Sequence, residues 1–227
     1  MARKSSANKI RLILKELRGH LPFTFLGVVS GIVFLGLVHG VFIRPSGMHS
    51  QTILRNFFHT FHFSHIFLSA IATTAVFFRH ERDILKTVLV GFFGTLIPCG
   101  TSDIFIPYFG GKLLGMPMTF HFCLIEEPTA VLLANSAGIL VGMIAELKFG
   151  RISYFSHSAH VFVSSFASLF YLVSFGIDNW FKLLLGIFVI TVVAVVIPCC
   201  SSDIVIPLSF VTGAHGHEHE DEHTEKR

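Results

Sequence analysis

Long apolar runs alternate along the chain with short polar turns. Four of these runs predict simple membrane-spanning helices, at Phe23–Ile43, Phe61–Phe78, Thr129–Ala145 and Ser158–Ile177. Each is about as long as a helix that crosses a hydrocarbon core of roughly 30 Å. The pattern therefore predicts an integral membrane protein of the all-α class.

Two further apolar segments, Ile84–Gly115 and Phe181–Val211, are longer than one simple span. Each contains two prolines with small polar residues between them. A proline inside a helix removes a backbone hydrogen bond and clashes with the preceding turn, so we expect broken helices here. With both segments counted, the prediction is a polytopic helical membrane protein of about six spans.

The sequence contains an internal repeat. Ile97–Pro107 returns as Ile197–Pro207, with eight of eleven positions identical. The motif His62-x-x-His65-Ile-Phe-x-Ser69 returns as His157-x-x-His160-Val-Phe-x-Ser164. Three small residues also match at one constant offset, which pairs Pro22, Ser30 and Gly36 with Pro128, Ser136 and Gly142. These matches predict two copies of one unit.

The repeat divides the chain into four parts. They are a basic N-terminal segment at residues 1–21, repeat units at 22–116 and 117–212, and a tail at 213–227. If each broken helix crosses the membrane, a unit has three spans and the two units are inverted; if it re-enters, the units are parallel. We favour the inverted 3+3 arrangement, because the residues on both sides of the break together make about one tilted span.

Composition and charge agree with a membrane protein. The chain is 52% apolar and 14% charged, with a mean hydropathy of +0.69, which excludes an ordinary soluble domain. Six lysines and arginines precede the first span, so we expect both termini in the cytoplasm and an inner or plasma membrane of prokaryotic type. The sequence has no phosphate-binding loop, dinucleotide fingerprint or nucleic-acid motif.

Two carboxylates, Asp103 and Asp203, lie within otherwise uncharged apolar segments. An ionised side chain there costs at least about 2.5–3.5 kcal/mol at the bilayer centre. The simpler interpretation is that each Ser-Asp pair caps a helix that restarts after the proline. Recurrence in both copies favours a cation site between the repeats, whose predicted ligands are Cys99, Ser102, Asp103, Cys199, Cys200, Ser202 and Asp203.

Histidines supply further candidate metal ligands. The pairs His62/His65 and His157/His160 are spaced i, i+3, so each pair shares one helix face, and His59 extends the first pair by one turn. Hydrogen bonding near a span end is the alternative. In the inverted arrangement we expect one pair to open toward each side of the membrane. Asn135 is one more candidate ligand, on a small-residue face that otherwise predicts close helix packing.

The C-terminal tail alternates imidazoles with carboxylates. It has too little apolar character to fold, and we expect a disordered chelator of divalent metals or a charged solubilising tail. Its candidate chelators are His215, His217, His219 and His223.

The sequence also resembles a known family. The duplicated Ile-Pro-Cys break, which begins as Leu96-Ile-Pro-Cys-Gly100, and the later Leu132-Leu-Ala-Asn-Ser136 are similar to motifs of heavy-metal exporter permeases, described as manganese transporters with His-rich loops. The resemblance covers Leu96–Ser136 and the second break. It implies a metal permease, although those permeases have more spans than this chain.

The resulting hypothesis is a permease for a divalent transition metal. The metal, which is the substrate, is not distinguished among Mn, Zn, Fe, Co and Ni, and the repeats are expected to move about the central site. The expected partners are the lipid bilayer, the metal ion and, because the chain is small for a permease, a second copy in a homodimer. The alternatives are a membrane-embedded metal-dependent enzyme that uses the histidine clusters, and a sensor whose tail binds the metal.

Overall fold

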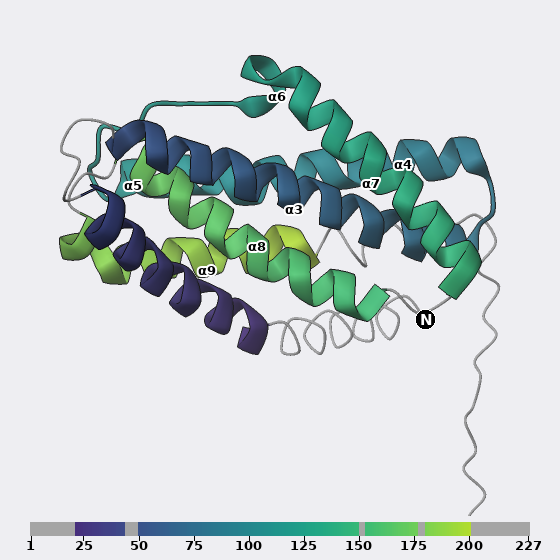
Figure 1. Ribbon diagram of the computed structural model, residues 1–227, viewed down its shortest axis with the longest axis horizontal. Coiled ribbons are helices and arrows are strands. Elements are labelled where there is room, and N and C mark those ends of the chain that lie inside the picture. Colours follow the sequence, from purple (N-terminus) through teal and green to yellow (C-terminus); the bar gives the residue numbers. More distant parts are fainter. Residues whose placement is uncertain (1–20, 44–49, 150–152, 177–179, 201–227) are drawn as a thin grey trace, which may run out of the picture.

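The computed structural model describes residues 21–43, 50–149, 153–176 and 180–200, and within these ranges the regular structure is helical throughout (Figure 1). A helix at residues 21–38 continues into the π-helix η1. The elements, in chain order, are η1 (His39–Ile43), α3 (Ser50–His80), α4 (Ile84–Gly100), η2 (Thr101–Phe105), α5 (Ile106–Leu113), α6 (Cys123–Glu126), α7 (Pro128–Phe149), α8 (Ser153–Ser174), η3 (Trp180–Leu183) and α9 (Leu184–Cys200).

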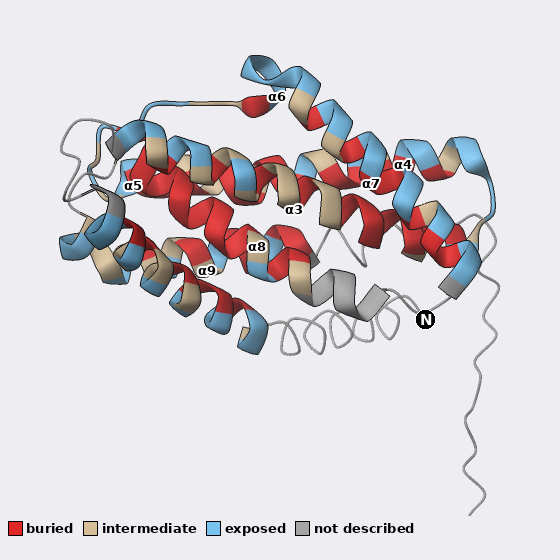
Figure 2. Cartoon of the chain, in the orientation of Figure 1, coloured by how far each residue is buried: buried red, intermediate tan, exposed pale blue. Residues whose placement is uncertain are grey.

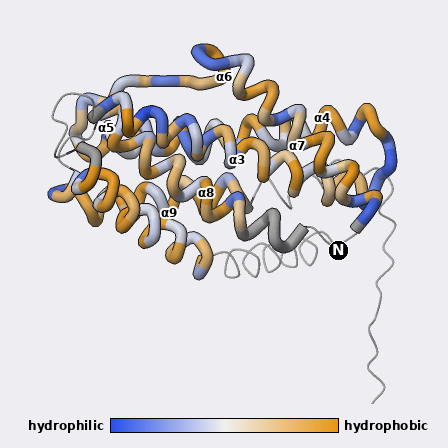
Figure 3. The backbone as a smooth tube through the Cα atoms, in the orientation of Figure 1, coloured by the Kyte–Doolittle hydropathy of each residue, from blue (hydrophilic) through white to orange (hydrophobic). Residues whose placement is uncertain are grey.

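Five of the described helical segments are long and apolar enough to cross a membrane. They are Leu21–Val41, Gln51–His80, Ile84–Leu113, Pro128–Lys148 and Trp180–Cys199, while the apolar part of α8 is shorter, at Ala159–Ser174. Hydrophobic residues extend along these helices, whereas the turn between α3 and α4 is hydrophilic (Figure 3). This is the architecture expected of an integral membrane protein.

Helix α3 is the central element, with α8 packed antiparallel to it. The ring of His65 stacks on that of His160, and the ring of Phe58 contacts that of Tyr171, so residue numbers rise along α3 as they fall along α8. Buried residues run along much of both helices (Figure 2). The core of the protein therefore lies between α3 and α8.

Helix α7 packs parallel to α3. A Cβ at Gly138 would lie 2.5 Å from the backbone oxygen of Phe67, so the two helices approach too closely there for a larger residue. Twelve residues further along α3, Arg79 donates two hydrogen bonds to Glu146, at 2.9 and 2.8 Å. The prediction that small residues on α7 serve close helix packing is confirmed at Gly138.

Two of the predicted helix starts are wrong. Helix α3 begins at Ser50 rather than Phe61, and α8 begins at Ser153 rather than Ser158. In the missed first part of α3, the polar Arg55 and Asn56 are exposed, while the apolar Leu54 and Phe58 are buried. Hydropathy records partition into lipid, so it misses a helical extension whose exposed positions are polar.

The predicted break around Asp103 is also wrong, because the helix continues through it as the π turn η2. The backbone N–H of Ile106 donates to the carbonyl of Thr101, five residues back, and the residues that flank η2 keep right-handed helical dihedrals. No side chain caps η2 or α5, so the Ser-Asp pair is not an N-cap. The second Ser-Asp pair, the basic segment and the tail lie outside the described residues.

The π turn also accommodates Pro107. With five-residue spacing, the next backbone donor would be residue 107 and its acceptor the carbonyl of Ser102, but proline has no N–H. The hydroxyl of Ser168 on α8 donates to that carbonyl instead, at 2.9 Å. The irregular helix is therefore stabilised by its neighbour rather than by its own backbone.

Candidate functional site

Asp103 lies at the centre of the buried site. Its side chain is fully buried, and each carboxylate oxygen accepts two hydrogen bonds. Oδ2 lies 2.8 Å from Nδ1 of His62 and 2.7 Å from Nδ1 of His65. Oδ1 accepts from the hydroxyls of Ser102, at 2.7 Å, and Ser164, at 3.0 Å. This arrangement of four donors suits an ionised carboxylate, which can only accept hydrogen bonds.

The carboxylate determines which nitrogen of each histidine is protonated. Since Oδ2 accepts from both imidazoles, His62 and His65 carry their hydrogens on Nδ1. In a neutral imidazole that donates from Nδ1, Nε2 keeps a lone pair and lies on the side of the ring away from Asp103. Histidines that bind metals are commonly oriented in this way, by a carboxylate that holds the opposite ring nitrogen.

Sulfur and a third imidazole surround Nε2 of His65. The Sγ of Cys99 lies 3.7 Å from this nitrogen and the Sγ of Cys199 lies 4.0 Å from it. The ring of His160 stacks on that of His65 with centroids 5.7 Å apart. One ligand atom from each of His65, His160 and Cys199 lies within 4.8 Å of the others, and all three residues are buried.

These distances fit a tetrahedral metal site. With zinc–nitrogen bonds of about 2.0–2.1 Å and zinc–sulfur bonds of about 2.3 Å, bound nitrogen and sulfur atoms lie about 3.6 Å apart. The separations of 3.7 and 4.0 Å between Nε2 and the two sulfurs are close to that value. His65, His160 and Cys199, whose ligand atoms lie mutually close, can therefore hold a metal through nitrogen and sulfur, and Cys99 lies beside His65 as a further candidate.

The site joins equivalent positions of the sequence repeat. His65 corresponds to His160, and Cys99 corresponds to Cys199. One cysteine comes from α4 and the other from α9, while the histidines come from α3 and α8. Four segments that are far apart in sequence thus contribute to one buried cluster, which we call the central cluster: Cys99, Ser102, Asp103, His62, His65, His160, Ser164 and Cys199.

Both oxygens of Asp103 accept hydrogen bonds, and the carboxylate positions His62 and His65; direct binding of the cation by Asp103 stays a prediction. One expectation for this site needs correction. The histidine pairs were expected to open toward opposite sides, but His65 and His160 stack on each other. The reason is the earlier start of α3 and α8, which moves these residues from the helix ends toward the helix centres.

Several predicted ligands lie elsewhere or cannot be placed. Asn135 is fully buried on α7, one turn before Gly138, and its side-chain atoms make no hydrogen bond within the described part of the chain. His59 lies in a second cluster. The remaining predicted ligands have side chains outside the described residues: His157, Cys200, Ser202, Asp203 and the four histidines of the tail.

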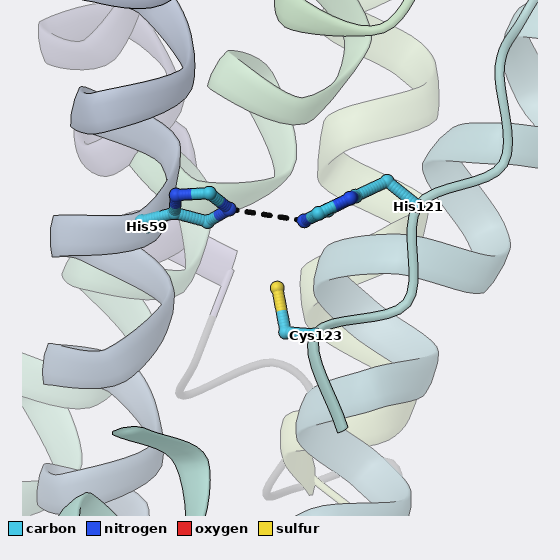
Figure 4. A group of neighbouring side chains, drawn as sticks. All are labelled: His59, His121 and Cys123. Carbon is cyan, nitrogen blue, oxygen red and sulfur yellow. Dashed lines mark hydrogen bonds between the residues drawn. The ribbon is translucent and has the colours of Figure 1, made fainter. Parts of the chain in front are cut away.

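A second cluster, at the end of the core near α6, consists of His59, His121 and Cys123 (Figure 4). The Nε2 atoms of His59 and His121 lie 3.0 Å apart. Burial raises the pKa of the Cys123 thiol to about 12, so the thiol is protonated at neutral pH. We call these residues the outer cluster, because both of its histidines are partly exposed.

Sequence reasoning missed four residues of these sites. Ser164 was visible as the last residue of the repeated His-x-x-His motif, but it was not recognised as a partner of the carboxylate. No repeat contains Ser168, His121 or Cys123, and only the packing of α8 and of the segment before α7 brings them into place.

Comparisons with known proteins found no matching family model, no matching curated protein and no matching solved structure. The resemblance to heavy-metal exporter permeases therefore stays a prediction.

Proposed function

We propose that the protein is a membrane transporter whose substrate is a divalent transition-metal cation. The observation that carries this proposal is the convergence of His65, His160, Cys99 and Cys199 beside a buried carboxylate. Burying so many polar ligand atoms among apolar helices costs free energy, so their presence indicates a function. Metal binding is the function that matches these residue types.

The donors favour a borderline metal over a hard one. Imidazole and thiolate suit Zn²⁺, Co²⁺, Ni²⁺ and Fe²⁺, whereas Mn²⁺ prefers oxygen ligands. Since the oxygens of Asp103 are already hydrogen-bonded, the nitrogen and sulfur atoms are the available ligands. Asp103 contributes its negative charge and holds His62 and His65 in orientation.

Helix directions support an inverted repeat. Helix α3 runs antiparallel to α8, its counterpart in the second unit, as the contacts of His65 and Phe58 indicate. A Cβ at Gly110 would meet Ile190, and one at Gly186 would meet Leu114, so α5 and α9 are antiparallel too. Opposite directions for equivalent segments are the property of inverted units. The proposal therefore includes three crossings per unit, with both termini on the cytoplasmic side.

In this proposal the substrate binds where the two units meet. Helices α3 and α4 belong to the first unit and α8 and α9 to the second, and each unit supplies one histidine and one cysteine. A relative movement of the units would open the central cluster to one side and then to the other, as in other transporters with inverted repeats. The sequence contains no ATP-binding motif, so an ion gradient or a separate protein would supply the energy.

A transport assay tests the proposal. In liposomes loaded with a zinc-sensitive dye, we expect the double variant His65→Ala/Cys199→Ser to lose zinc uptake. The matched control is His80→Ala, because His80 ends the same helix, is exposed, and bonds the carbonyl of Val76 within that helix. Uptake by the double variant equal to that of the wild type would refute the proposal.

A membrane-embedded metal-dependent enzyme is the second candidate. The stacking of His65 on His160 favours an enzyme, because an enzyme gathers its metal ligands at one site. Histidine pairs that open toward opposite sides of the membrane would instead lie apart. Transport explains in addition why each unit of the repeat supplies equivalent ligands. Zinc uptake without any added organic substrate separates the two functions.

A further inference from the structure

The outer cluster brings together three residues from separate elements. His59 lies on α3, one turn before His62, while His121 lies in the connection after α5 and Cys123 is the first residue of α6. The two imidazoles point toward each other, and the thiol of Cys123 lies beside them (Figure 4). Their ligand atoms all lie within 4.8 Å of one another.

The surrounding residues fix the orientation of His121. Its Nδ1 lies 2.8 Å from Oε2 of Glu126, and its backbone N–H donates to the hydroxyl of Tyr171 at 3.2 Å. Its ring stacks on Phe175 with centroids 4.6 Å apart and an interplanar angle of 11°. Glu126 thus holds Nδ1 of His121 as Asp103 holds Nδ1 of His65, and Nε2 is directed at His59.

The separation of the two nitrogens is close to that of a metal-bound pair. Two nitrogens bound tetrahedrally to zinc at about 2.0–2.1 Å lie about 3.3 Å apart, against 3.0 Å here. The ring of His59 stacks on Phe63, which keeps the imidazole in place while a metal enters. Two nitrogens and one sulfur leave a fourth position for water or a transferred ligand.

We propose that His59, His121 and Cys123 form a second metal-binding site, which takes Zn²⁺ or a similar borderline cation from solution. Both histidines are partly exposed, whereas those of the central cluster are buried. His59, His62 and His65 follow one another at intervals of three residues along one side of α3. The proposed role of this site as the mouth of the metal pathway rests on the proposed function, but the binding site itself does not.

The site is specific to one end of the protein. The position in the second unit that corresponds to His59 is occupied by Tyr154, and neither His121 nor Cys123 belongs to a repeated motif. A transporter built from inverted repeats, with the outer cluster at only one end, binds metal more strongly at that end of the pathway than at the other. Such an asymmetry would allow metal to be collected on one side at low concentration.

Cobalt binding by the full-length protein in detergent tests the site. Cobalt bound to a thiolate gives an intense near-ultraviolet charge-transfer band, and the tail, which has no cysteine, cannot produce this band. The background variant is His65→Ala/Cys199→Ser, which disables the central cluster. We expect it to bind Co²⁺ with the band, and expect Zn²⁺ to displace Co²⁺. Adding Cys123→Ser should abolish the band and weaken binding at least tenfold.

Glu126 and its neighbour provide a matched pair. Glu126→Gln should weaken cobalt binding by about 10–100-fold, because the carboxylate that orients His121 is lost. Glu127→Gln removes the same charge one residue away, and we expect its affinity to stay within threefold of the background. If the contact between Glu126 and His121 is purely structural, the midpoint of thermal unfolding will not change when metal is added.

The result that would overturn the proposal is an unchanged charge-transfer band after Cys123→Ser. Failure of the second-site proposal is distinguishable from failure of the transport proposal, because metal binding to the outer cluster is measured with the central cluster disabled. In liposomes, Cys123→Ser alone should raise the zinc concentration needed for half-maximal uptake without abolishing uptake. If the zinc concentration for half-maximal uptake is unchanged in Cys123→Ser, the outer cluster is not the mouth of the metal pathway.

Discussion

At the residue scale, Asp103 organises the central cluster through its hydrogen bonds. The carboxylate has four hydrogen-bond donors around it, two from imidazoles and two from hydroxyls. Its charge is thereby compensated within the protein, which is how an ionised group can lie among apolar helices. Asp103 thus orients two candidate metal ligands, His62 and His65.

The substitution Asp103→Asn tests this role. Asparagine keeps the size of the side chain but removes the negative charge, and one of its two polar atoms becomes a donor. In a Cys123→Ser background, we expect the cobalt affinity of the central cluster to fall by about 10–100-fold, measured by the charge-transfer band. Ser164→Ala is the control, because it removes one donor and keeps the charge. Equal affinities of Asp103→Asn and the wild type would contradict the assigned role.

At the element scale, the π turn η2 carries the carboxylate of the central cluster. Asp103 lies within it and Cys99 lies just before it on α4, and both side chains contact His65. The irregularity leaves the carbonyl of Ser102 without a donor in its own helix, and Ser168 supplies that donor. Helix α8 therefore stabilises the shape of the neighbouring helix as well as contributing His160 and Ser164.

Ser168→Ala should destabilise the fold by about 1–3 kcal/mol, because a buried carbonyl loses its hydrogen-bond partner. The matched control is Ser165→Ala. Ser165 is also buried on α8, but its hydroxyl donates to the carbonyl of Val161 in its own helix, which keeps its backbone hydrogen bond. Thermal unfolding in detergent, followed by circular dichroism, measures the difference. Equal midpoints for the two variants would contradict the role of Ser168.

At the scale of the whole molecule, the packing of the helices bears on the direction in which each segment crosses the membrane. Helix α3 packs parallel to α7 and antiparallel to α8. The long segment Ile84–Leu113 is continuous within the structure. These directions agree with the inverted units of the proposed transporter, in which one site is approached from both sides.

Labelling of single introduced cysteines tests the crossing of Ile84–Leu113. Arg82 and Lys148 are exposed at one end of the bundle, and Lys112 and Glu127 are exposed at the other. In membrane vesicles, we expect an impermeant thiol reagent to label cysteines at 82 and 148 from one side and those at 112 and 127 from the opposite side. The unmodified chain is the control for labelling of its own four cysteines, of which Cys99, Cys123 and Cys199 are buried. Labelling of positions 82 and 112 from the same side would indicate re-entry.

The sequence by itself determined the class of the protein and much of its candidate chemistry. Apolar runs predict membrane helices because transfer of a side chain into lipid depends on its own composition. The repeat and the isolated carboxylate indicated Cys99, Asp103, His65, His160 and Cys199 because both are visible without knowledge of packing. Five apolar helices of sufficient length agree with the predicted class.

Only the tertiary structure decided how these residues are used. The early start of α3, the π turn in place of a break, and the contact of the Ser164 hydroxyl with Asp103 all depend on which helix faces which. The same is true of His121 and Cys123, which meet His59 across a connection of irregular shape. A polar side chain that is satisfied inside the protein looks the same in sequence as one that faces water. Its partner is chosen by helix rotation and packing, which no local pattern encodes.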